Sequence, residues 1–335
     1  MVTIRKIAER CGVSTATVSK ALSHAPDIGE DTAQRVRKTA QEMGYFPNAA
    51  ARSLKTRHTR NLGVITSLRI ANGMSHDFIA RLISFIQNTA EENGYDITLL
   101  SNQMAGMNFM EHCRYRNFDG VALVCCGFAR EDVQEVLHGE IPCVCVDYQT
   151  PGYGNVMTDT RLALDQLVGY VYDQGHRRLA YIHGEDSYIT QERMAAFRQA
   201  CAARSLTVPE EAIRMAYYNY PAGAAEATRS LLRLAARPTC IFYQDDYAAT
   251  GGLDALAAEG LRVPEDVSVV AYDGISLSSL LTPPLTTYWQ DAETIGREAT
   301  IMLLSAVEAP ETYQPRHLLV PGRLLTGGTV RRLII

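Results

Sequence analysis

The sequence predicts an all-α helix-turn-helix head followed by an α/β core of two lobes. Three observations lead to this prediction. Short amphipathic segments punctuated by glycine fill residues 1–46, and strand-like apolar runs alternate with helical segments from Leu62 onward. Charge is also uneven, because residues 1–60 hold 11 of the 32 basic side chains but only five of the 37 acidic ones. This asymmetry predicts a basic head that meets a polyanion and an acidic body that does not.

Composition excludes several classes of protein. The 335 residues are 47% apolar and 21% charged, as in ordinary globular chains. No run of about 20 apolar residues is present, and the N-terminus lacks a signal-peptide core, so we expect a cytoplasmic protein with no membrane partner. The eight cysteines lack metal-site spacing, so we expect reduced thiols and no metal.

The first two helices have clear start and stop signals. Thr3 can cap a helix over residues 4–11, and Gly12 ends it where a left-handed conformation is needed. Ser14 can then cap a helix over residues 15–22. Two short helices joined by a glycine turn are typical of a helix-turn-helix, whose second helix enters the major groove of DNA.

The third helix completes the head. It is predicted over residues 30–43, with acidic side chains in its first turn and Gly44 after its end. On the second helix, Thr15, Ala16 and Lys20 lie outside the apolar face. Small side chains allow close approach to DNA and lysine can reach guanine, although an unremarkable three-helix bundle is the alternative interpretation.

The stretch "PNAAARSLKTRHTRN" from Pro47 favours a hinge. A helix this short is marginal in water, so it is predicted to fold only on DNA. Leu54 between Arg52 and Lys55 resembles a wedge that opens a base step in the minor groove. A plain interdomain linker is the alternative.

The body alternates strand-like and helical segments. Strand-like runs include "LGVIT", "DITLL", "GVALVC", "PCVCVD", "LAYIHG", "CIFYQ" and "VSVVAYDG", with amphipathic segments between them. Such alternation indicates parallel sheets with helices on both faces. The strands are too numerous for one ordinary sheet, so we expect two lobes.

Polar residues follow several of these strands. Asp147 and Tyr148 follow "CVCV", Asp245 and Asp246 follow "CIFYQ", and Asp273 follows "VVAY". Arg193 comes shortly after "LAYIHG". Because ligands bind at the carboxyl ends of the strands of open α/β sheets, we expect these residues in one cleft. Carboxylates and an arginine suit a polyol. The alternative is that the acids only cap helices.

These motifs together resemble the LacI/GalR family of bacterial transcription regulators. The resemblance rests on "TIRKIAERCGVSTATVSKALS", "ARSLKTRHTRNLGVI", "GHRRLAYIHG", the segment from "RPTCIFYQDD" to "VSVVAYDG", and "TPPLTT", and covers nearly the whole chain. It implies a core like that of periplasmic sugar-binding proteins, in which the chain crosses between lobes more than once. We therefore expect a head over 1–46, a hinge over 47–60, and a core over 61–335. Its first lobe takes about 61–161 and 289–320, and its second 162–288 and 321–335.

The resemblance also implies site residues. With the hinge reasoning above, the DNA contacts expected are Thr15, Ala16, Thr17, Lys20, Asn48, Arg52, Leu54 and Lys55. Effector contacts implied by the family are Phe78, Tyr148, Arg193, Tyr218, Asp246 and Asp273, and the strand-end argument adds Asp147. Asp77 stands where the family often has an aromatic residue, and could accept a hydroxyl or face solvent.

The predicted function follows from both halves. We expect a homodimer that binds double-stranded operator DNA and acts as a repressor. A small-molecule effector, a sugar rather than a purine, is expected to control this binding. No motif for catalysis is present, so we expect neither an enzyme nor a cofactor. Two alternatives remain open: a regulator controlled by a phosphocarrier protein, and a transport-type sugar-binding protein.

Overall fold

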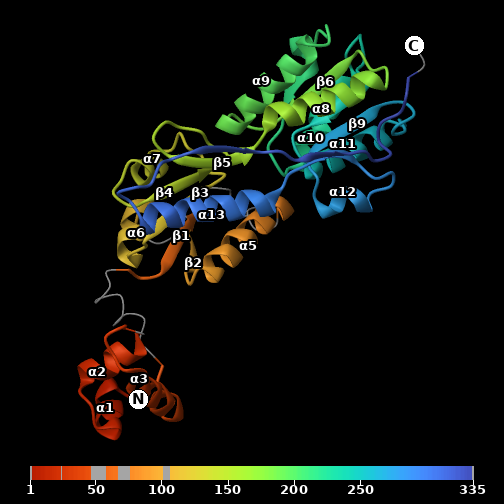
Figure 1. Ribbon diagram of the computed structural model, residues 1–335. Helices are drawn as coiled ribbons and strands as arrows, with labels where there is room; N and C mark the ends of the chain where they lie inside the picture. The colour runs from red at the N-terminus through yellow and green to blue at the C-terminus, as the bar shows by residue number, and fades with distance from the viewer. Residues whose placement is uncertain (1, 24, 47–57, 67–75, 101–105, 334–335) are drawn as a thin grey trace. The chain divides into compact units, whose positions relative to one another are not determined.

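A computed structural model of the chain describes residues 2–23, 25–46, 58–66, 76–100 and 106–333. The chain divides into two compact units, Met1–Thr59 and Arg60–Ile335, called here the head and the core. Figure 1 shows the head as helices only and the core as two sheets with helices around them. The two units are described separately.

The head contains the three predicted helices. They are α1 (Ile4–Cys11), α2 (Thr15–Leu22) and α3 (Glu30–Glu42). The Thr3 hydroxyl accepts from the backbone N–H of Lys6 at 3.4 Å, and Gly12 ends α1 in the left-handed conformation (φ 65°). The predicted caps are therefore confirmed, and α3 ends one residue before the expected Met43.

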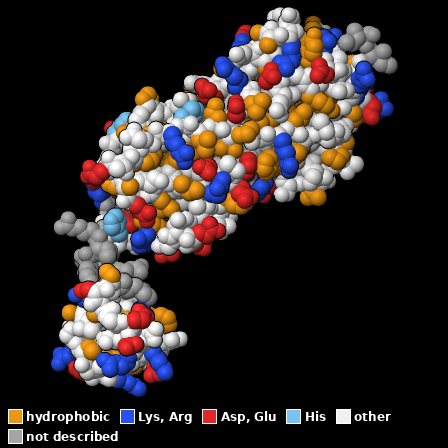
Figure 2. Space-filling view, viewed as in Figure 1, with side chains coloured by type: hydrophobic (Ala, Val, Ile, Leu, Met, Phe, Trp, Pro, Cys, Tyr) orange, Lys and Arg blue, Asp and Glu red, His pale blue; other side chains and the backbone are white. Residues whose placement is uncertain are grey.

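A compact apolar cluster holds the three helices together. Its buried members are Ile7, Ala8, Val18, Ala21, Ala33, Val36 and Ala40. Val13 packs against this cluster from the turn between α1 and α2, which agrees with the hydrophobic staple that the spacing of Val13 and Val18 favours. Figure 2 shows Lys and Arg side chains gathered along one edge of the head.

The core contains two six-stranded sheets, which define its first and second lobes. The first sheet, in spatial order, is β11 (His317–Val320), β5 (Gly154–Thr158), β4 (Cys143–Val146), β3 (Gly120–Val124), β1 (Asn61–Ile65) and β2 (Asp96–Leu100). The second sheet is β12 (Arg323–Leu325), β10 (Thr286–Trp289), β9 (Ser268–Asp273), β8 (Cys240–Tyr243), β6 (Leu179–His183) and β7 (Ile213–Met215).

Helices cover both faces of each sheet (Figure 1). The first lobe carries α5 (Asp77–Glu92) and α13 (Ala292–Glu308) on one face, and α6 (Phe109–Arg116) and α7 (Glu131–Leu137) on the other. The second lobe carries α8 (Thr160–Asp173) and α9 (Tyr188–Ala202) on one face, and α10 (Pro221–Leu232) and α11 (Asp246–Ala258) on the other. The short elements η1 (Glu210–Ala212) and α12 (Ser276–Leu280) complete this lobe. The predicted two-lobed α/β architecture is confirmed.

The chain passes between the lobes three times. It leaves the first lobe after β5, returns after β10 to form α13 and β11, and leaves again to form β12. The last strand differs from the prediction of purely parallel sheets, because β12 pairs with β10 antiparallel. Only two residues separate β11 from β12, so the chain enters the second sheet directly from the first lobe. It makes no crossover through a helix of the second lobe, which is the connection that parallel neighbours need.

Two further expectations concern thiols and membranes. All eight cysteines are free, and six of them are buried, as expected for reduced thiols used as small apolar side chains. Among the helices that the structure describes, none combines the length and apolar character needed to cross a bilayer.

Candidate functional site

The outer face of α2 presents small polar side chains to solvent. Thr15, Ala16 and Lys20 are exposed, while Val18 and Ala21 are buried in the head. Thr17 is half-buried, and its backbone N–H and hydroxyl both bond the Ser14 hydroxyl, at 3.0 and 2.9 Å. Thr17 therefore helps to cap the helix, and the other three side chains form its accessible surface.

Lys20 has a partner in the head itself. Its ammonium group forms a salt bridge with the Asp27 carboxylate, and both side chains are about half exposed. The hydrogen bond from Lys20 lowers the pKa of Asp27. The predicted hinge contacts Asn48, Arg52, Leu54 and Lys55 lie outside the described residues.

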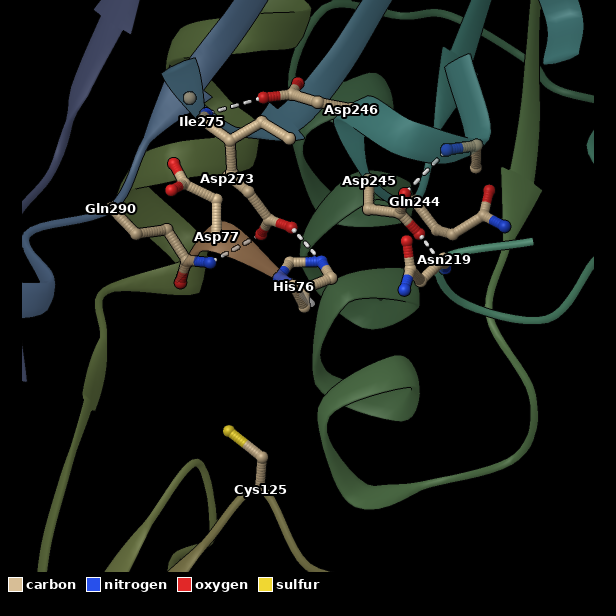
Figure 3. A network of polar contacts seen from close by, with 12 residues as sticks. His76, Asp77, Cys125, Asn219, Gln244, Asp245, Asp246, Asp273, Ile275 and Gln290 are labelled. Atoms are coloured by element: carbon tan, nitrogen blue, oxygen red, sulfur yellow. Dashed lines mark hydrogen bonds and ion pairs between the residues drawn. The ribbon is translucent and has the colours of Figure 1, made fainter. Parts of the chain in front are cut away.

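In the core, a polar network forms where the two lobes meet (Figure 3). Asp273 ends β9 and accepts a hydrogen bond of 2.6 Å from the side-chain amide of Gln290. Its other oxygen lies 3.3 Å from Nε2 of His76, at the start of α5 in the first lobe. Gln290 in turn accepts a 2.6 Å bond from Thr158, at the end of β5. The network therefore joins both lobes.

Arg193 supplies the buried cation of this site. It lies on α9, donates to the backbone oxygen of Gln244 at 2.9 Å, and has a nitrogen 3.8 Å from Asp273. Its guanidinium group lies 4.0 Å from the centre of the Tyr272 ring and 5.7 Å from that of Tyr218. Charge pairing and the two rings compensate the burial of this cation.

The carboxylates of the site titrate differently. Burial raises the pKa of Asp147, although the charge of Arg193 opposes this. Burial also raises the pKa of Asp245 to about 6, with a further increase from the Asp273 charge. For Asp273, burial acts in the same direction, but the hydrogen bond and charge of His76 and the charge of Arg193 lower its pKa overall. Asp273 is therefore the carboxylate that stays charged most readily.

The structure brings most of the predicted core residues together. Asp147 accepts a bond from the Cys125 thiol at 3.4 Å. The Tyr148 ring lies edge-on to that of Tyr188 on α9, with centroids 5.0 Å apart, so it contacts the second lobe. Tyr218 shares a 3.0 Å hydrogen bond with Thr190 beside Arg193.

Two predicted residues face other surroundings. Phe78 is buried in the apolar cluster of the first lobe. Asp246 accepts from the backbone N–H of Ile275 at 2.8 Å and from the Thr287 hydroxyl at 2.6 Å. The helix cap of α11 is Asp245, which accepts from the N–H of Ala248. The side chain of Asp246 thus holds the segment after β9 in place.

Several buried polar atoms at this junction have no hydrogen-bond partner among the described residues. They are Nδ1 of His76, Oδ1 of Asp147, Nε of Arg193, Oε1 of Gln244 and the Tyr272 hydroxyl. Native proteins rarely leave such atoms unpaired, and here five of them surround one charge network. Donors and acceptors are both represented, so a ligand with hydroxyl groups could satisfy them.

Sequence reasoning missed three of these groups. His76 carried no signal, because it meets Asp273 only through a contact far away in the sequence. Gln244 directly follows β8, so the argument from strand ends could have found it. Gln290 directly follows β10, and the same strand-end argument that selected Asp273 could have found it.

Two family models match the chain. Residues 3–48 match bacterial regulatory proteins of the lacI family, and residues 168–330 match a periplasmic binding protein-like domain. The first match falls on the head and the start of the predicted hinge, and the second falls mainly on the second lobe of the core.

Relatives are similar over almost the whole length. The HTH-type transcriptional repressor PurR of Actinobacillus pleuropneumoniae serotype 3 (strain JL03) is 31% identical, with 99% of each chain covered. The probable HTH-type transcriptional repressor ExuR of Bacillus subtilis (strain 168) is 29% identical, again with 99% of each covered.

Solved structures share the fold. The transcriptional regulator CelR–cellobiose complex has a TM-score of 0.72 at 26% identity, covering 98% of this chain and all of that one. The lac repressor dimer bound to operator and the anti-inducer ONPF has a TM-score of 0.85 at 22% identity, covering 98% and 99%.

Proposed function

The chain belongs to the lacI family of bacterial regulatory proteins, and from this premise we propose how it works as a DNA-binding transcriptional regulator. Residues 1–46 bind operator DNA, 47–60 form the hinge, and 61–335 bind the effector and form the dimer. The relatives with which it shares nearly its full length are repressors, and we propose repression here too.

Two heads of a homodimer would place α2 in successive major grooves of a pseudo-palindromic operator. The exposed Thr15, Ala16 and Lys20 fit this role, because small side chains permit close approach and lysine can bond guanine. From the hinge, Leu54 would enter the minor groove at the centre, while Arg52 and Lys55 would contact phosphates. Such contacts make affinity fall steeply with salt.

The proposed effector is a sugar, and the unpaired buried polar atoms between the lobes carry this proposal. Arg193 Nε offers a donor, Asp147 Oδ1 and Gln244 Oε1 offer acceptors, and Asp273 lies among them. A polyol carries a donor and an acceptor on every hydroxyl, so it can match such a mixed set. The effector contacts proposed are Asp147, Tyr148, Arg193, Tyr218 and Asp273. Phe78, in the apolar cluster of the first lobe, and Asp246, which bonds Ile275 and Thr287, are proposed to support these contacts through packing and hydrogen bonds.

A flat nucleobase fits this site less well. Bases are held by stacking on aromatic faces, but Arg193 covers the Tyr272 ring at 4.0 Å. The Tyr148 ring stacks on Phe128 with centroids 4.0 Å apart. One face of each of these two rings is thus engaged within the protein, whereas the polar atoms named above remain for the ligand.

A thermal-shift screen tests the effector proposal. Purified protein is heated with neutral sugars, sugar acids, sugar phosphates and nucleobases, since a ligand of the folded state raises the unfolding temperature. We expect stabilisation by a neutral sugar, lost in Arg193→Ala and Asp273→Ala. A response to nucleobases alone would contradict the proposal. If no compound binds while operator DNA does, the effector assignment is wrong. Regulation of operator binding by a protein such as a phosphocarrier is then the favoured interpretation.

The hinge is tested separately. Leu54→Ala should weaken operator binding far more than sugar binding, measured by fluorescence anisotropy and by calorimetry on the same preparation. An equal loss of both would contradict the hinge role.

A further inference from the structure

His76 connects the effector site to the opposite lobe. Its Nε2 lies 3.3 Å from Oδ2 of Asp273, and the two side chains are only 12% and 6% exposed. His76 directly precedes α5 in the first lobe, whereas Asp273 ends β9 in the second (Figure 3). This buried pair thus joins the two lobes at a carboxylate that faces Arg193.

The next residue reinforces the same contact. Oδ2 of Asp77 accepts from the backbone N–H of Ser276 at 3.1 Å and from its hydroxyl at 3.3 Å. Between these contacts, Ile275 packs into the apolar cluster of the first lobe. Two adjacent residues of the first lobe therefore hold residues 273–276 of the second.

We propose that His76 is a positioning residue of the effector site, which orients Asp273 and holds the lobes together more strongly when its ring is protonated. The inference rests on the proposed function in treating Asp273 as an effector contact. Nδ1 of His76 is buried and has no hydrogen-bond partner among the described residues. Effector recognition and lobe closure would share one side chain.

The charges around His76 set the sign of the pH dependence. Asp273, Asp245 and Arg193 face the ring from the second lobe, the Tyr247 ring lies edge-on at 5.5 Å, and Asp77 is its chain neighbour. Burial lowers the pKa of His76, but the hydrogen bond and charge of Asp273, helped by Asp245, raise it above 6.5 overall, with Arg193 opposing.

A proton therefore binds the closed arrangement more tightly than an open one, in which the pKa returns toward 6.5. The extra stability that the protonated ring gives the closed arrangement is fully present below pH 6.5 and is lost as the pH rises through the raised pKa of His76. A neutral ring can still donate from Nε2, so closure weakens at high pH without disappearing.

Amide hydrogen exchange tests this in the full chain, without effector or DNA. The reporter is the segment 274–280, because the N–H of Ser276 bonds Asp77 only while the lobes are closed. Three proteins are compared at pH 6 and at pH 8: wild type, His76→Gln and His76→Ala. Glutamine keeps a neutral donor toward Asp273, whereas alanine removes it. Comparison at equal pH cancels the intrinsic exchange rate.

At pH 6 we expect segment 274–280 to exchange at least about five times more slowly in wild type than in His76→Gln. At pH 8 the two proteins should exchange at nearly the same rate. His76→Ala should exchange fastest at both values. The proposal is overturned if the ratio of wild type to His76→Gln does not change with pH, or if His76→Ala is as protected as wild type. Should the alanine variant not fold, the glutamine comparison decides alone.

Asp245 is the main competing source of pH dependence. Its pKa of about 6 lies in the same range. However, its oxygens accept from the N–H groups of Ala248 and Asn219 within its own lobe, and it is present in all three proteins. Because the experiment contains no effector, its failure leaves the sugar screen and the operator assays unaffected.

Discussion

The outer face of α2 and the junction between the lobes are the two regions proposed for recognition, and they lie in opposite environments. Thr15, Ala16 and Lys20 are exposed on a helix that its buried face already holds. Arg193 and Asp273 are 6% exposed and bound into a network. A DNA duplex brings an extended charged surface to the protein, whereas a small ligand must be surrounded. Changes at α2 should therefore affect binding alone, and changes at the junction should affect binding and folding together.

The largest effect is expected for Arg193→Met. The substitution removes a buried cation, leaves Asp147 without its main compensating charge, and leaves Asp273 with the compensation of His76 alone among the cations that act on it. Breaking a buried pair in this way destabilises by about 3–5 kcal/mol. Urea unfolding at pH 7, followed by far-ultraviolet circular dichroism, measures the loss.

Arg198→Met on the same helix is the matched control. Arg198 pairs with Glu210 in solvent, with the two side chains 50% and 77% exposed, so its loss should change the free energy of unfolding by less than about 1 kcal/mol. Equal effects of the two substitutions would show that the junction gains nothing from its buried charge.

A similar loss of stability in the head should have a different consequence. Ile7 is fully buried in a small cluster that includes several alanines. Ile7→Ala should lower the free energy of unfolding of the head by about 2–4 kcal/mol. Because head and core are separate units, calorimetry should show the core transition unchanged while operator binding falls.

Ile4→Ala is the graded control, because Ile4 is only half-buried. A smaller loss of operator binding is expected for it. A shift in the core transition with Ile7→Ala would mean that the two units do not unfold independently.

The head could be predicted almost completely from the sequence because its signals are local. Caps such as Thr3 and Ser14 act within three residues, and the buried positions recur at helical spacing. The antiparallel edge strand β12 was missed, because its direction depends on where the chain returns from the other lobe. Local patterns carry no information about that return.

The junction could be predicted only in part, for the same physical reason. Asp147 and Asp273 follow apolar strands, so a general rule about strand ends finds them. His76 precedes a helix and acquires its role through a contact about 200 positions away in the chain. Asp245 and Asp246 looked equivalent in sequence, but one caps α11 and the other bonds Ile275 and Thr287.

A third, smaller effect is expected for Lys20→Ala. Lys20 is exposed, so the free energy of unfolding should change by less than about 0.5 kcal/mol. Discrimination between operator and unrelated DNA should fall by about 1–3 kcal/mol if the lysine reads a base. Anisotropy titrations with both DNAs measure it.

Lys38→Ala removes the same charge from an exposed position on α3 and serves as the control. It should weaken binding to both DNAs alike, as expected for a general electrostatic contribution. If Lys20→Ala also weakens both equally, its role is limited to phosphate contact.

The smallest effect is expected for Asp27→Asn, which releases Lys20 from its salt bridge. Both side chains are about half exposed, so the pair is weak and DNA phosphates can replace it. Operator affinity should rise by less than about threefold, and by less again at high salt. Since the pKa of Asp27 is lowered from 3.8, the pair is lost only as pH falls through that lower value, and the effect should be equal at pH 6 and pH 8. A rise above tenfold, or one that varies over this range, would mean that Lys20 is held as firmly as the buried groups, and the contrast between the two regions would not hold.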